Sequence, residues 1–264
     1  MITSDFHIHS TFSDGRDRVA AICAHAVEIG VTELCFTEHI DFDVNDPDFG
    51  RYNDAAFSKS VAKARLAFAG TLSIAKGCEF DFSTTYGADY AAFLDPLEFD
   101  FILGSVHNIF GYHIGRRELL ERTPRELQEE YLRQIRALAG SGLCHVLAHF
   151  DYLQRLYCTD WQTDPRDEWY WARVDDILRL CVGEGIGIEV NTQGAIPGLV
   201  EPAAQSEILR RYHALGGRIV TVGSDAHHAG QLQQGFDVAE DILKGAGFAE
   251  IAVFKEGRPV FRSL

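Results

Sequence analysis

The chain has 264 residues and a formal net charge of −15, with 46% hydrophobic and 24% charged residues. This composition is ordinary for a soluble globular protein and excludes the disordered and fibrous classes. The 39 acidic residues against 24 basic ones argue against a nucleic-acid-binding protein, because such proteins need a basic surface to displace counterions.

Short apolar runs alternate with helical stretches, which predicts a parallel sheet with helices outside it. The expected strands are residues 2–6, 31–37, 72–78, 99–106, 143–148, 186–190 and 218–224. The expected helices are residues 18–29, 54–69, 124–139, 168–183, 201–215 and 236–243. Residues 251–261 predict a small hairpin. Seven strand–helix units favour a closed or distorted barrel over an open sheet. No linker or composition break interrupts the chain, so we expect one domain over residues 1–264.

The cysteines and the N-terminal segment indicate where the protein works. Six scattered cysteines form no Cys-x-x-Cys pair, and several lie in apolar runs, so we expect reduced core residues. The N-terminus has neither the basic nor the apolar region of a signal peptide. No apolar run approaches the roughly 20 residues that span a bilayer. We therefore expect a cytoplasmic protein without a membrane partner.

A polar side chain that could bind a metal follows each of the seven expected strands. In chain order these side chains are His7 and His9, then Glu38 and His39, Glu79, His107, His149, Asn191, and finally Asp225 and His227. In β/α barrels the chemistry is built from the carboxyl ends of several strands. The order of the chain therefore predicts that these residues converge on one rim.

The spacing of these residues supports a shared site. His7 and His9 are two residues apart on a strand, so their side chains point to the same face. The pair is a weak signal by itself, but Asp225 and His227 repeat the same spacing. Glu79 at a strand end is unusual because an unpaired buried carboxylate is costly. Its position becomes sensible if it bridges two cations.

The whole set is far more specific than any member. Asp14, in a Ser-Asp-Gly loop, would by itself more often be a turn residue. The nine candidate metal ligands are His7, His9, Asp14, His39, Glu79, His107, His149, Asp225 and His227. Imidazole and carboxylate ligands suit Zn, Fe or Mn, and the lack of a cysteine ligand argues against a closed structural zinc site. Nine ligands are too many for one ion but suffice for three divalent ions with open positions for water and substrate.

The remaining histidines receive simpler interpretations. His25 and His213 lie in expected helices. His145 lies inside an expected strand, where we expect a role in the core. His113 and His228 lie nearer the rim and could contact a substrate.

The motifs resemble those of the PHP (polymerase and histidinol phosphatase) superfamily, in order and over nearly the whole chain. They are His7-Ile8-His9, Asp14-Gly15, Thr37-Glu38-His39, Gly77-Cys78-Glu79, Gly104-Ser105-Val106-His107, Ala148-His149 and Gly223-Ser224-Asp225-Ala226-His227. The chain is most similar to the histidinol-phosphate phosphatase branch. The features behind this narrower resemblance are Ser-Asp-Gly after the first motif, Gly-Ser-Val-His, the segment 189–194, and an aspartate at position 14 where other branches often have histidine.

The resemblance implies an α/β fold, a distorted seven-stranded TIM-like (β/α) barrel, with a trinuclear metal site. One metal would be held by His7, His9, Glu79 and Asp225, a second by Glu79, His107 and His149, and a third by Asp14, His39 and His227. Glu79 would bridge the first two. Related phosphatases often carry a basic residue shortly after the Asn-Thr-x-Gly segment, whereas residues 195–199 here contain neither Lys nor Arg.

The implied metal site leads to hypotheses about the phosphate contacts and the catalytic groups. Arg155 is the first candidate phosphate contact, Arg116 is the second, and His228 is a further candidate substrate contact. We expect a hydroxide activated by the bridged metals to attack phosphorus, with Glu79, Asp225 and His227 as the catalytic groups of the centre. The sequence does not choose between Asp41 and His228 as donor of the proton to the leaving group.

The expected substrate is a small phosphate monoester, with L-histidinol phosphate as the best single hypothesis. Three alternatives stay open. One is a phosphoesterase of the same fold that acts on another phosphate ester or on a nucleic-acid phosphodiester. The others are an amidohydrolase, which also opens with His-x-His, and a non-catalytic metal-binding protein. The sequence indicates no oligomeric state.

Overall fold

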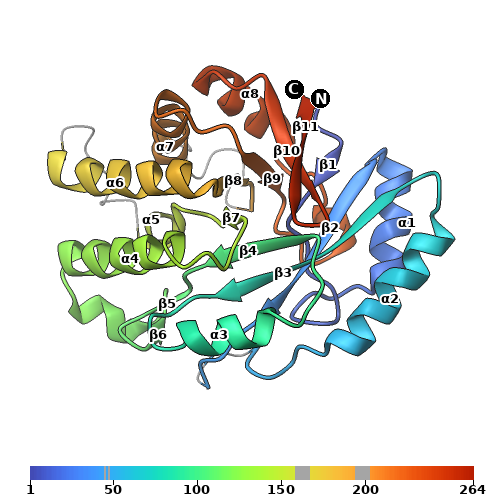
Figure 1. Cartoon of the computed structure of the whole chain (residues 1–264), viewed down its shortest axis with the longest axis horizontal. Helices are drawn as coiled ribbons and strands as arrows, with labels where there is room; N and C mark the ends of the chain where they lie inside the picture. The colour runs from blue at the N-terminus through green and yellow to red at the C-terminus, as the bar shows by residue number, and fades with distance from the viewer. Residues whose placement is uncertain (45, 47, 158–166, 194–202) are drawn as a thin grey trace.

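A computed structural model of the protein describes residues 1–44, 46, 48–157, 167–193 and 203–264 (Figure 1). Seven strands form one sheet in the order β1-β2-β3-β4-β7-β8-β9, and every neighbouring pair is parallel. The strands are β1 (Ser4–Asp5), β2 (Glu33–Ile40), β3 (Ser73–Asp81), β4 (Phe101–Ser105), β7 (Val146–Leu147), β8 (Gly187–Asn191) and β9 (Val220–Gly223). All seven predicted strands are confirmed.

The first and last strands of this sheet meet and nearly close it into a barrel. The backbone N–H of Phe6 donates to the carbonyl of Val222 at 3.0 Å, and that of His9 donates to Ala226 at 2.9 Å. The sequence favoured a barrel without settling its closure. These hydrogen bonds bring the barrel close to closure, because they join segments at the two ends of the strand order.

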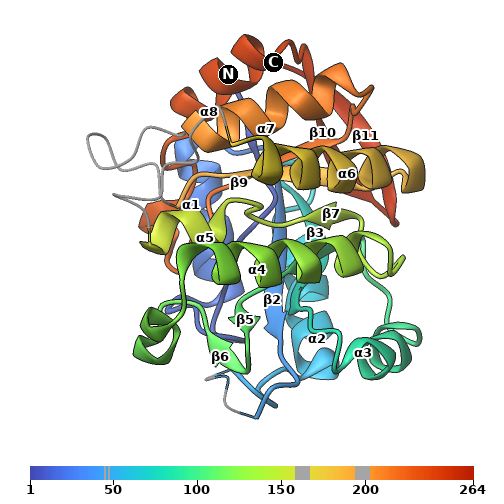
Figure 2. The same cartoon turned by 90° about the vertical axis from the view of Figure 1, so that its left-hand side faces the viewer.

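Helices cover the outside of the barrel (Figures 1 and 2). They are α1 (Val19–Ile29), α2 (Asp54–Ala67), α3 (Gly87–Leu94), α4 (Pro124–Ala139), α5 (Tyr152–Tyr157), α6 (Glu168–Glu184), α7 (Ala203–Ala214) and α8 (Phe236–Ala246), with 3-10 turns η1 (Arg117–Glu121) and η2 (Ala229–Gln231). The six predicted helices are present. The sequence missed α3, α5 and the small hairpin of β5 (Asn108–Ile109) and β6 (Tyr112–His113), which are too short to show a clear repeat.

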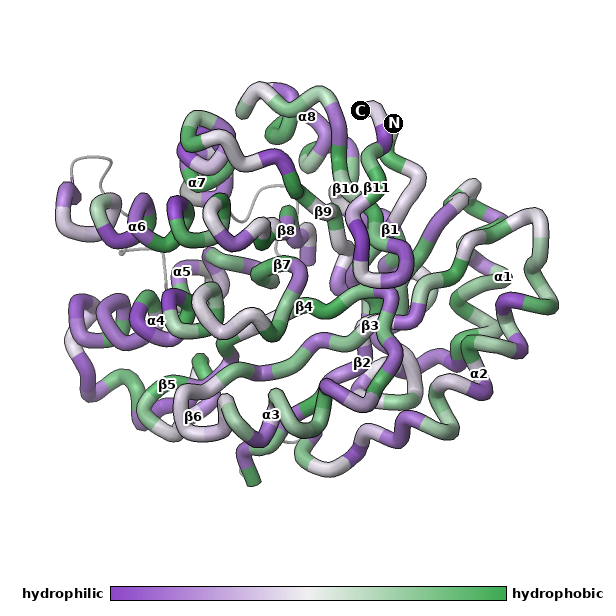
Figure 3. Tube along the Cα trace, viewed as in Figure 1, coloured by the Kyte–Doolittle hydropathy of each residue, from purple (hydrophilic) through white to green (hydrophobic). Residues whose placement is uncertain are grey.

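Helix α4 shows how local sequence produces these elements. Thr123 Oγ1 accepts a hydrogen bond from the backbone N–H of Glu126, and Glu126 Oε2 accepts one from the backbone N–H of Thr123 at 2.8 Å. This capping box satisfies two N–H groups at the helix start. Leu127, Tyr131 and Leu138 lie on the buried side, and the tube of α4 in Figure 3 accordingly shows both purple and green segments.

A C-terminal hairpin of β10 (Glu250–Lys255) and β11 (Arg258–Ser263) lies across the amino end of the barrel, which confirms the predicted hairpin. Val253 and Phe254 are buried in one apolar cluster with Phe101, and the Phe254 and Phe101 rings are 4.8 Å apart. The hairpin turn is tied to the start of β4, because the N–H of Gly257 donates to the carbonyl of Asp100 at 3.0 Å. The hairpin therefore closes the end of the barrel where the strands begin.

The described cysteines lie in the core. Five cysteines, Cys23, Cys35, Cys78, Cys144 and Cys181, are free and buried, as predicted, and Cys158 lies outside the described residues. Among the described residues, each helix is too short or too polar to traverse a lipid bilayer.

Candidate metal centre

The nine predicted ligands come together at the carboxyl end of the barrel. Their ligand atoms form three overlapping groups, and within each group these atoms lie within 4.8 Å of one another. The groups are His7, His9 and Glu79; Glu79, His107 and His149; and His9, Asp14, His39 and His227. Asp225 joins the first group, with Oδ1 at 3.3 Å from His9 Nε2 and 3.6 Å from His7 Nε2.

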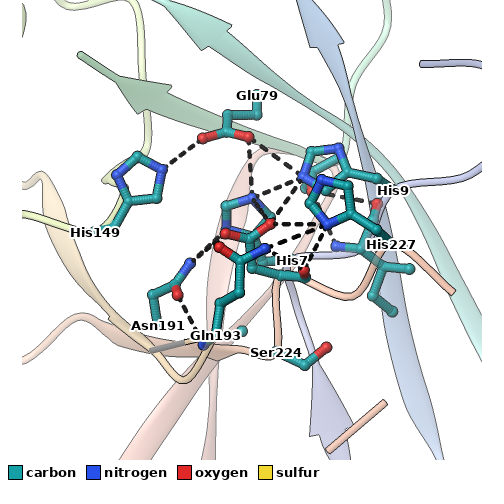
Figure 4. Close-up of polar contacts among 12 residues, drawn as sticks. His7, His9, Glu79, His149, Asn191, Gln193, Ser224 and His227 are labelled. Carbon is teal, nitrogen blue, oxygen red and sulfur yellow. Dashed lines mark hydrogen bonds and ion pairs between the residues drawn. The ribbon is translucent and has the colours of Figure 1, made fainter. Parts of the chain in front are cut away.

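Glu79 lies between His149 on one side and His7 and His9 on the other (Figure 4). Its Oε2 is 3.0 Å from His7 Nε2 and 3.4 Å from His9 Nε2. Its Oε1 is 2.8 Å from His149 Nε2 and 3.4 Å from His107 Nε2. The side chain is 1% exposed. Each carboxylate oxygen therefore faces a different pair, which is the arrangement that a bridging ligand requires.

Asp14 forms the third group with His227 and His39. Its Oδ2 is 2.9 Å from His227 Nε2, and its Oδ1 is 3.7 Å from His39 Nε2. His9 connects this group to the first, since its Nδ1 lies 3.8 Å from Asp14 Oδ1 while its Nε2 faces Glu79. The three groups thus form one continuous centre.

A buried glutamate holds the loop that carries Asp14. Glu38 accepts hydrogen bonds from the backbone N–H and the hydroxyl of Ser10 and from the hydroxyl of Ser13. Burial raises the pKa of Glu38, although these hydrogen bonds oppose the rise. The Ser-Asp-Gly turn seen in the sequence is therefore pinned to the end of β2, which places Asp14 beside the histidines.

Two side chains of β8 form hydrogen bonds with the predicted metal ligands, a role that the sequence did not assign. Glu189 Oε1 is 2.6 Å from His7 Nδ1, and its Oε2 accepts the backbone N–H of His149 at 2.8 Å. Asn191 Nδ2 donates to Asp225 Oδ2 at 3.1 Å. Such outer contacts fix the ring orientation and the basicity of metal ligands. The available signal was spacing: residues 189 and 191 are two apart on a strand and share a face.

The buried carboxylates and histidines of the centre shift one another's pKa values. Burial lowers the pKa of His9, but the neighbouring Asp225 and Glu79 outweigh it and raise this pKa to about 10. Burial likewise lowers the pKa of His107, and Glu79 raises it to about 10. For Glu79 burial raises the pKa, but the surrounding histidines hold it well below its usual range.

Several buried polar atoms of the centre have no hydrogen-bond partner among the described residues. They are His9 Nδ1, His39 Nδ1, His149 Nδ1 and Asp14 Oδ1. Buried polar atoms are normally satisfied, and exceptions call for a reason. Imidazole and carboxylate donors are also the ligands that Zn, Fe and Mn accept. The residue set therefore fits divalent metal ions on its geometry and on its donor chemistry.

The centre opens into a pocket of about 240 Å³. Its lining includes seven of the nine ligands, all but His7 and His9, together with Asp41, Asp46, Asp48, His113, Tyr152 and Gln193. No lysine or arginine is among these lining residues, so within the described part of the chain the histidines are the only basic side chains on the wall.

The predicted substrate contacts fall in different places. His113 lines the pocket. Arg116 is exposed and His228 is half-buried, and neither belongs to the lining. The backbone of Arg155 lies in α5, but its side chain lies outside the described part, as do residues 194–202. The structure thus brings together all nine predicted metal ligands, whereas Arg116 lies outside the pocket lining.

The histidines interpreted as structural lie away from the centre. His145 Nδ1 accepts the backbone N–H of Ile102 at 2.9 Å, and its ring stacks on Phe254 at the amino end of the barrel. His25 pairs with Glu28 on α1. His213 on α7 lies against the ring of Phe248. The simpler interpretation of these three residues agrees with the structure.

A further acidic group, two members of which line the pocket, was not predicted from the sequence. One carboxylate oxygen from each of Asp41, Asp46 and Asp81 lies within 4.8 Å of the other two. Burial and the nearby Asp81 and Asp46 raise the pKa of Asp41 well above its usual range.

Comparisons with known proteins agree with this site. The PHP domain family matches residues 5–193. The histidinol-phosphatase of Lactococcus lactis subsp. lactis is 28% identical over 95% of this chain and 93% of its own length. The probable histidinol-phosphatase of Thermotoga maritima is 29% identical over 94% of each chain.

Two solved structures share the fold. The crystal structure of histidinol phosphate phosphatase from Lactococcus lactis, in complex with zinc, L-histidinol and phosphate, has a TM-score of 0.85 at 27% identity and covers 98% of each chain. The putative histidinol phosphatase of Listeria monocytogenes, at 20% identity and a TM-score of 0.78, covers 89% of this chain and 99% of its own and supports the barrel architecture alone.

Proposed function

This chain belongs to the PHP domain family, and from that premise we propose that it is a metal-dependent phosphomonoesterase that hydrolyses L-histidinol phosphate to L-histidinol and phosphate. The observation that carries the proposal is the convergence of nine imidazole and carboxylate ligands around Glu79 in one pocket. The same barrel in a relative of 27% identity binds zinc, L-histidinol and phosphate. In this proposal residues 1–264 form one catalytic domain.

Three divalent ions, Zn, Fe or Mn, would occupy the three ligand groups. His7, His9, Glu79 and Asp225 would hold the first, Glu79, His107 and His149 the second, and Asp14, His39 and His227 the third. When bound, such ions lower the pKa of a coordinated water and neutralise charge on a phosphoryl group. Their charge would also explain how a phosphate dianion enters a pocket whose described wall has no lysine or arginine.

The side chains of the protein keep this centre in position. Glu79 contacts His7 through one carboxylate oxygen and His149 through the other, so it would fix the spacing between the two sides of the site. Glu189 contacts His7 Nδ1, which directs Nε2 toward Glu79. Preorganised ligands of this kind contribute to catalysis because they need not rearrange during the reaction. Asp225 and His227, joined to the first and third groups, complete the proposed catalytic set.

The phosphodiesterase alternative receives no support from the pocket. A nucleic-acid strand needs a basic groove along its backbone, and the described lining is strongly acidic. The amidohydrolase alternative lacks support as well, because the family match and the named relatives are PHP proteins and histidinol phosphatases.

A substrate panel tests the proposal. We expect the purified protein, saturated with Zn or Mn, to show the highest kcat/KM on L-histidinol phosphate, a lower value on p-nitrophenyl phosphate, and little turnover of bis-p-nitrophenyl phosphate. Equal kcat/KM on the first two would remove the specific substrate, and a preference for the diester would remove the class.

Metal analysis tests the trinuclear site separately. After gentle purification and saturation we expect more than two ions per chain. A saturated protein with one ion or none would contradict the ligand assignment, whatever its activity.

A further inference from the structure

The third ligand group, which contains Asp14 and His227, is the part of the candidate metal centre nearest to solvent. The side chain of Asp14 is 30% exposed and that of His227 is 24% exposed, whereas those of Glu79 and His149 are 1% and 2% exposed. Asp14 also lies on the loop of residues 10–17 and does not directly follow a strand. The geometry of this group therefore depends on how firmly that loop is held.

The buried carboxylate of Glu38 holds the first half of the loop. Glu38 is 0% exposed. Its Oε1 accepts the hydroxyl of Ser10, and its Oε2 accepts the backbone N–H of Ser10 at 3.1 Å and the hydroxyl of Ser13 at 2.6 Å. An ionised carboxylate only accepts hydrogen bonds, so both hydroxyls donate to it. Since Ser13 directly precedes Asp14, these contacts set the position of the ligand.

Glu38 serves this purpose from the opposite face of the strand that carries a ligand. Glu38 and His39 are neighbours on β2, so their side chains point to opposite faces. His39 points into the metal centre, and Glu38 reaches the loop. The donors that Glu38 contacts are uncharged, and burying a carboxylate costs free energy. The end of β2 thus supplies one ligand of the third group and the support for another.

The second half of the loop is joined to the segment of His227. The backbone N–H of Arg16 donates to the carbonyl of His227 at 2.7 Å. Asp17 Oδ2 accepts the backbone N–H of Ala229 at 2.8 Å. A shift of the loop would therefore displace both ligands that it controls, its own aspartate and the histidine to which it is bonded.

We propose that Glu38 is a positioning residue for the third metal ion: it sets the affinity of that ion by fixing the Asp14 loop, and this ion is the most readily exchanged of the three. The inference rests on the proposed function, from which it takes the three-ion centre. The first two ligand groups share Glu79 and are buried, so they keep their ions when the loop is released. Activity would then follow the free metal concentration through one ion.

A chelator titration of the zinc-loaded protein tests the proposal. We expect the wild type to release one zinc ion before the other two, because the third group is the exposed one. In Glu38→Gln the amide NH₂ cannot accept a hydroxyl or N–H donor, so the loop loses part of its support. We expect the first ion to leave at roughly 10- to 100-fold lower chelator concentration, with the other two released as in the wild type.

A double-variant experiment shows whether Glu38 acts through the third group. His227→Ala removes a ligand of that group. In this background we expect Glu38→Gln to leave the release of the two remaining ions unchanged, because two changes that act through one site are not additive. The kcat/KM of Glu38→Gln alone should fall at limiting zinc and recover in excess zinc, which a general loss of structure would not allow.

Three further variants separate charge, folding and position. Glu28→Gln removes a carboxylate of α1 that is 78% exposed and keeps the wild-type release curve. Glu189→Gln removes a buried carboxylate that contacts His7, and it should weaken the binding of the more deeply buried ions. Ser13→Ala removes one donor to Glu38 and should ease release of the first ion by roughly severalfold. Ser13→Ala carries the test if Glu38→Gln does not fold.

Several outcomes would overturn the inference. A Glu38→Gln variant that binds three ions as tightly as the wild type would overturn it and leave the proposed function standing. Equal weakening of all three ions, or a further loss of metal in the double variant, would make Glu38 a general structural residue. A wild-type protein that saturates below three ions would overturn the three-ion centre and this inference with it, whereas the substrate panel would still decide the phosphatase activity.

Discussion

The two ends of the barrel are built from the same strands but from opposite chemistry. At the amino end, Phe6 and Phe101 pack edge to face with ring centroids 5.6 Å apart, and Phe254 of the hairpin covers them. At the carboxyl end the continuations of these strands carry His7 and His107, which belong to the candidate metal centre. An apolar cluster covers the first end, whereas the second retains buried polar atoms without partners among the described residues.

This contrast teaches how one fold separates stability from function. Burial of apolar surface favours folding wherever it occurs, but buried carboxylates and imidazoles cost free energy until a ligand meets them. The amino end therefore supplies the stability that allows the carboxyl end to hold an unsatisfied site. Changes at the amino end should alter the free energy of unfolding, and changes at the carboxyl end should alter metal content and rate.

The largest effect is expected at the amino end, in Phe101→Ala. Phe101 is fully buried and contacts the rings of Phe6 and Phe254. Removing its ring leaves a cavity, and we expect the free energy of unfolding to fall by about 3–5 kcal/mol. Denaturant titration measures this change, and kcat/KM of the folded protein at low temperature should stay near the wild-type value.

The exposed Leu66 on α2 provides a matched control for this variant. It is 82% exposed, so Leu66→Ala should change the free energy of unfolding by less than about 0.5 kcal/mol. A drop in kcat/KM as large as the change in stability in Phe101→Ala would contradict the separation of the two ends.

The next effect is expected at the carboxyl end, in Glu79→Gln. The substitution keeps the size of the side chain but removes the charge shared by two imidazole pairs. We expect a rate loss of at least about a hundredfold, the scale of losing one charge-stabilising group, together with weakened binding of two metals. Kinetics and metal analysis measure the two effects, and Glu129→Gln on the exposed side of α4 serves as control. Normal metal content and activity in Glu79→Gln would exclude the bridging role.

The sequence predicted one class of site residues and missed another, for physical reasons. The convergence of candidate ligands such as His107 and His149 could be predicted because each directly follows a buried strand, and parallel strands bring their carboxyl ends together. Glu189 acquires its role only from partners far along the chain, His7 and His149. Asp41 is 6% exposed, and its carboxylate oxygens accept no hydrogen bond from the described residues. Its burial likewise depends on several elements, which no local pattern encodes.

The fold shows the same division between local and distant information. The seven strands and the start of α4 follow from residues within a few positions of each other, through apolar runs and the capping box of Thr123 and Glu126. Closure of the barrel depends on contacts between distant segments, such as the hydrogen bond from His9 to Ala226. The sequence alone did not settle whether the barrel closes. Arg116 was predicted near the substrate from its charge alone, and its exposed position lies outside the pocket lining.

A smaller effect is expected from Glu189→Gln, which sharpens the distinction within the carboxyl end between ligands and the residues that orient them. Glu189 is 3% exposed and bonds His7 Nδ1. The amide keeps a hydrogen-bonding group in place but removes the charge that strengthens the ligand. We expect metal affinity or kcat/KM to fall by about 10- to 100-fold, with partial recovery of the rate at high metal concentration. A loss that excess metal does not change at all would mean that Glu189 acts on the reaction by another route.

The smallest effect is expected at the amino end, on the outer surface of the same hairpin whose inner face closes the barrel. Arg262 on β11 pairs with Glu33 at the start of β2, with Nε at 2.6 Å from Oε1 and Nη2 at 3.0 Å from Oε2. The geometry is bidentate, but the Arg262 side chain is 44% exposed, so water and salt screen the pair. We expect Arg262→Ala to lower the free energy of unfolding by less than about 1 kcal/mol, and by less still at high salt. Denaturant titration at two salt concentrations measures both values. A loss as large as that of Phe101→Ala would mean that the hairpin is held by its surface ion pair and not by the apolar cluster beneath it, and the amino end could then no longer be described as stabilised by apolar burial.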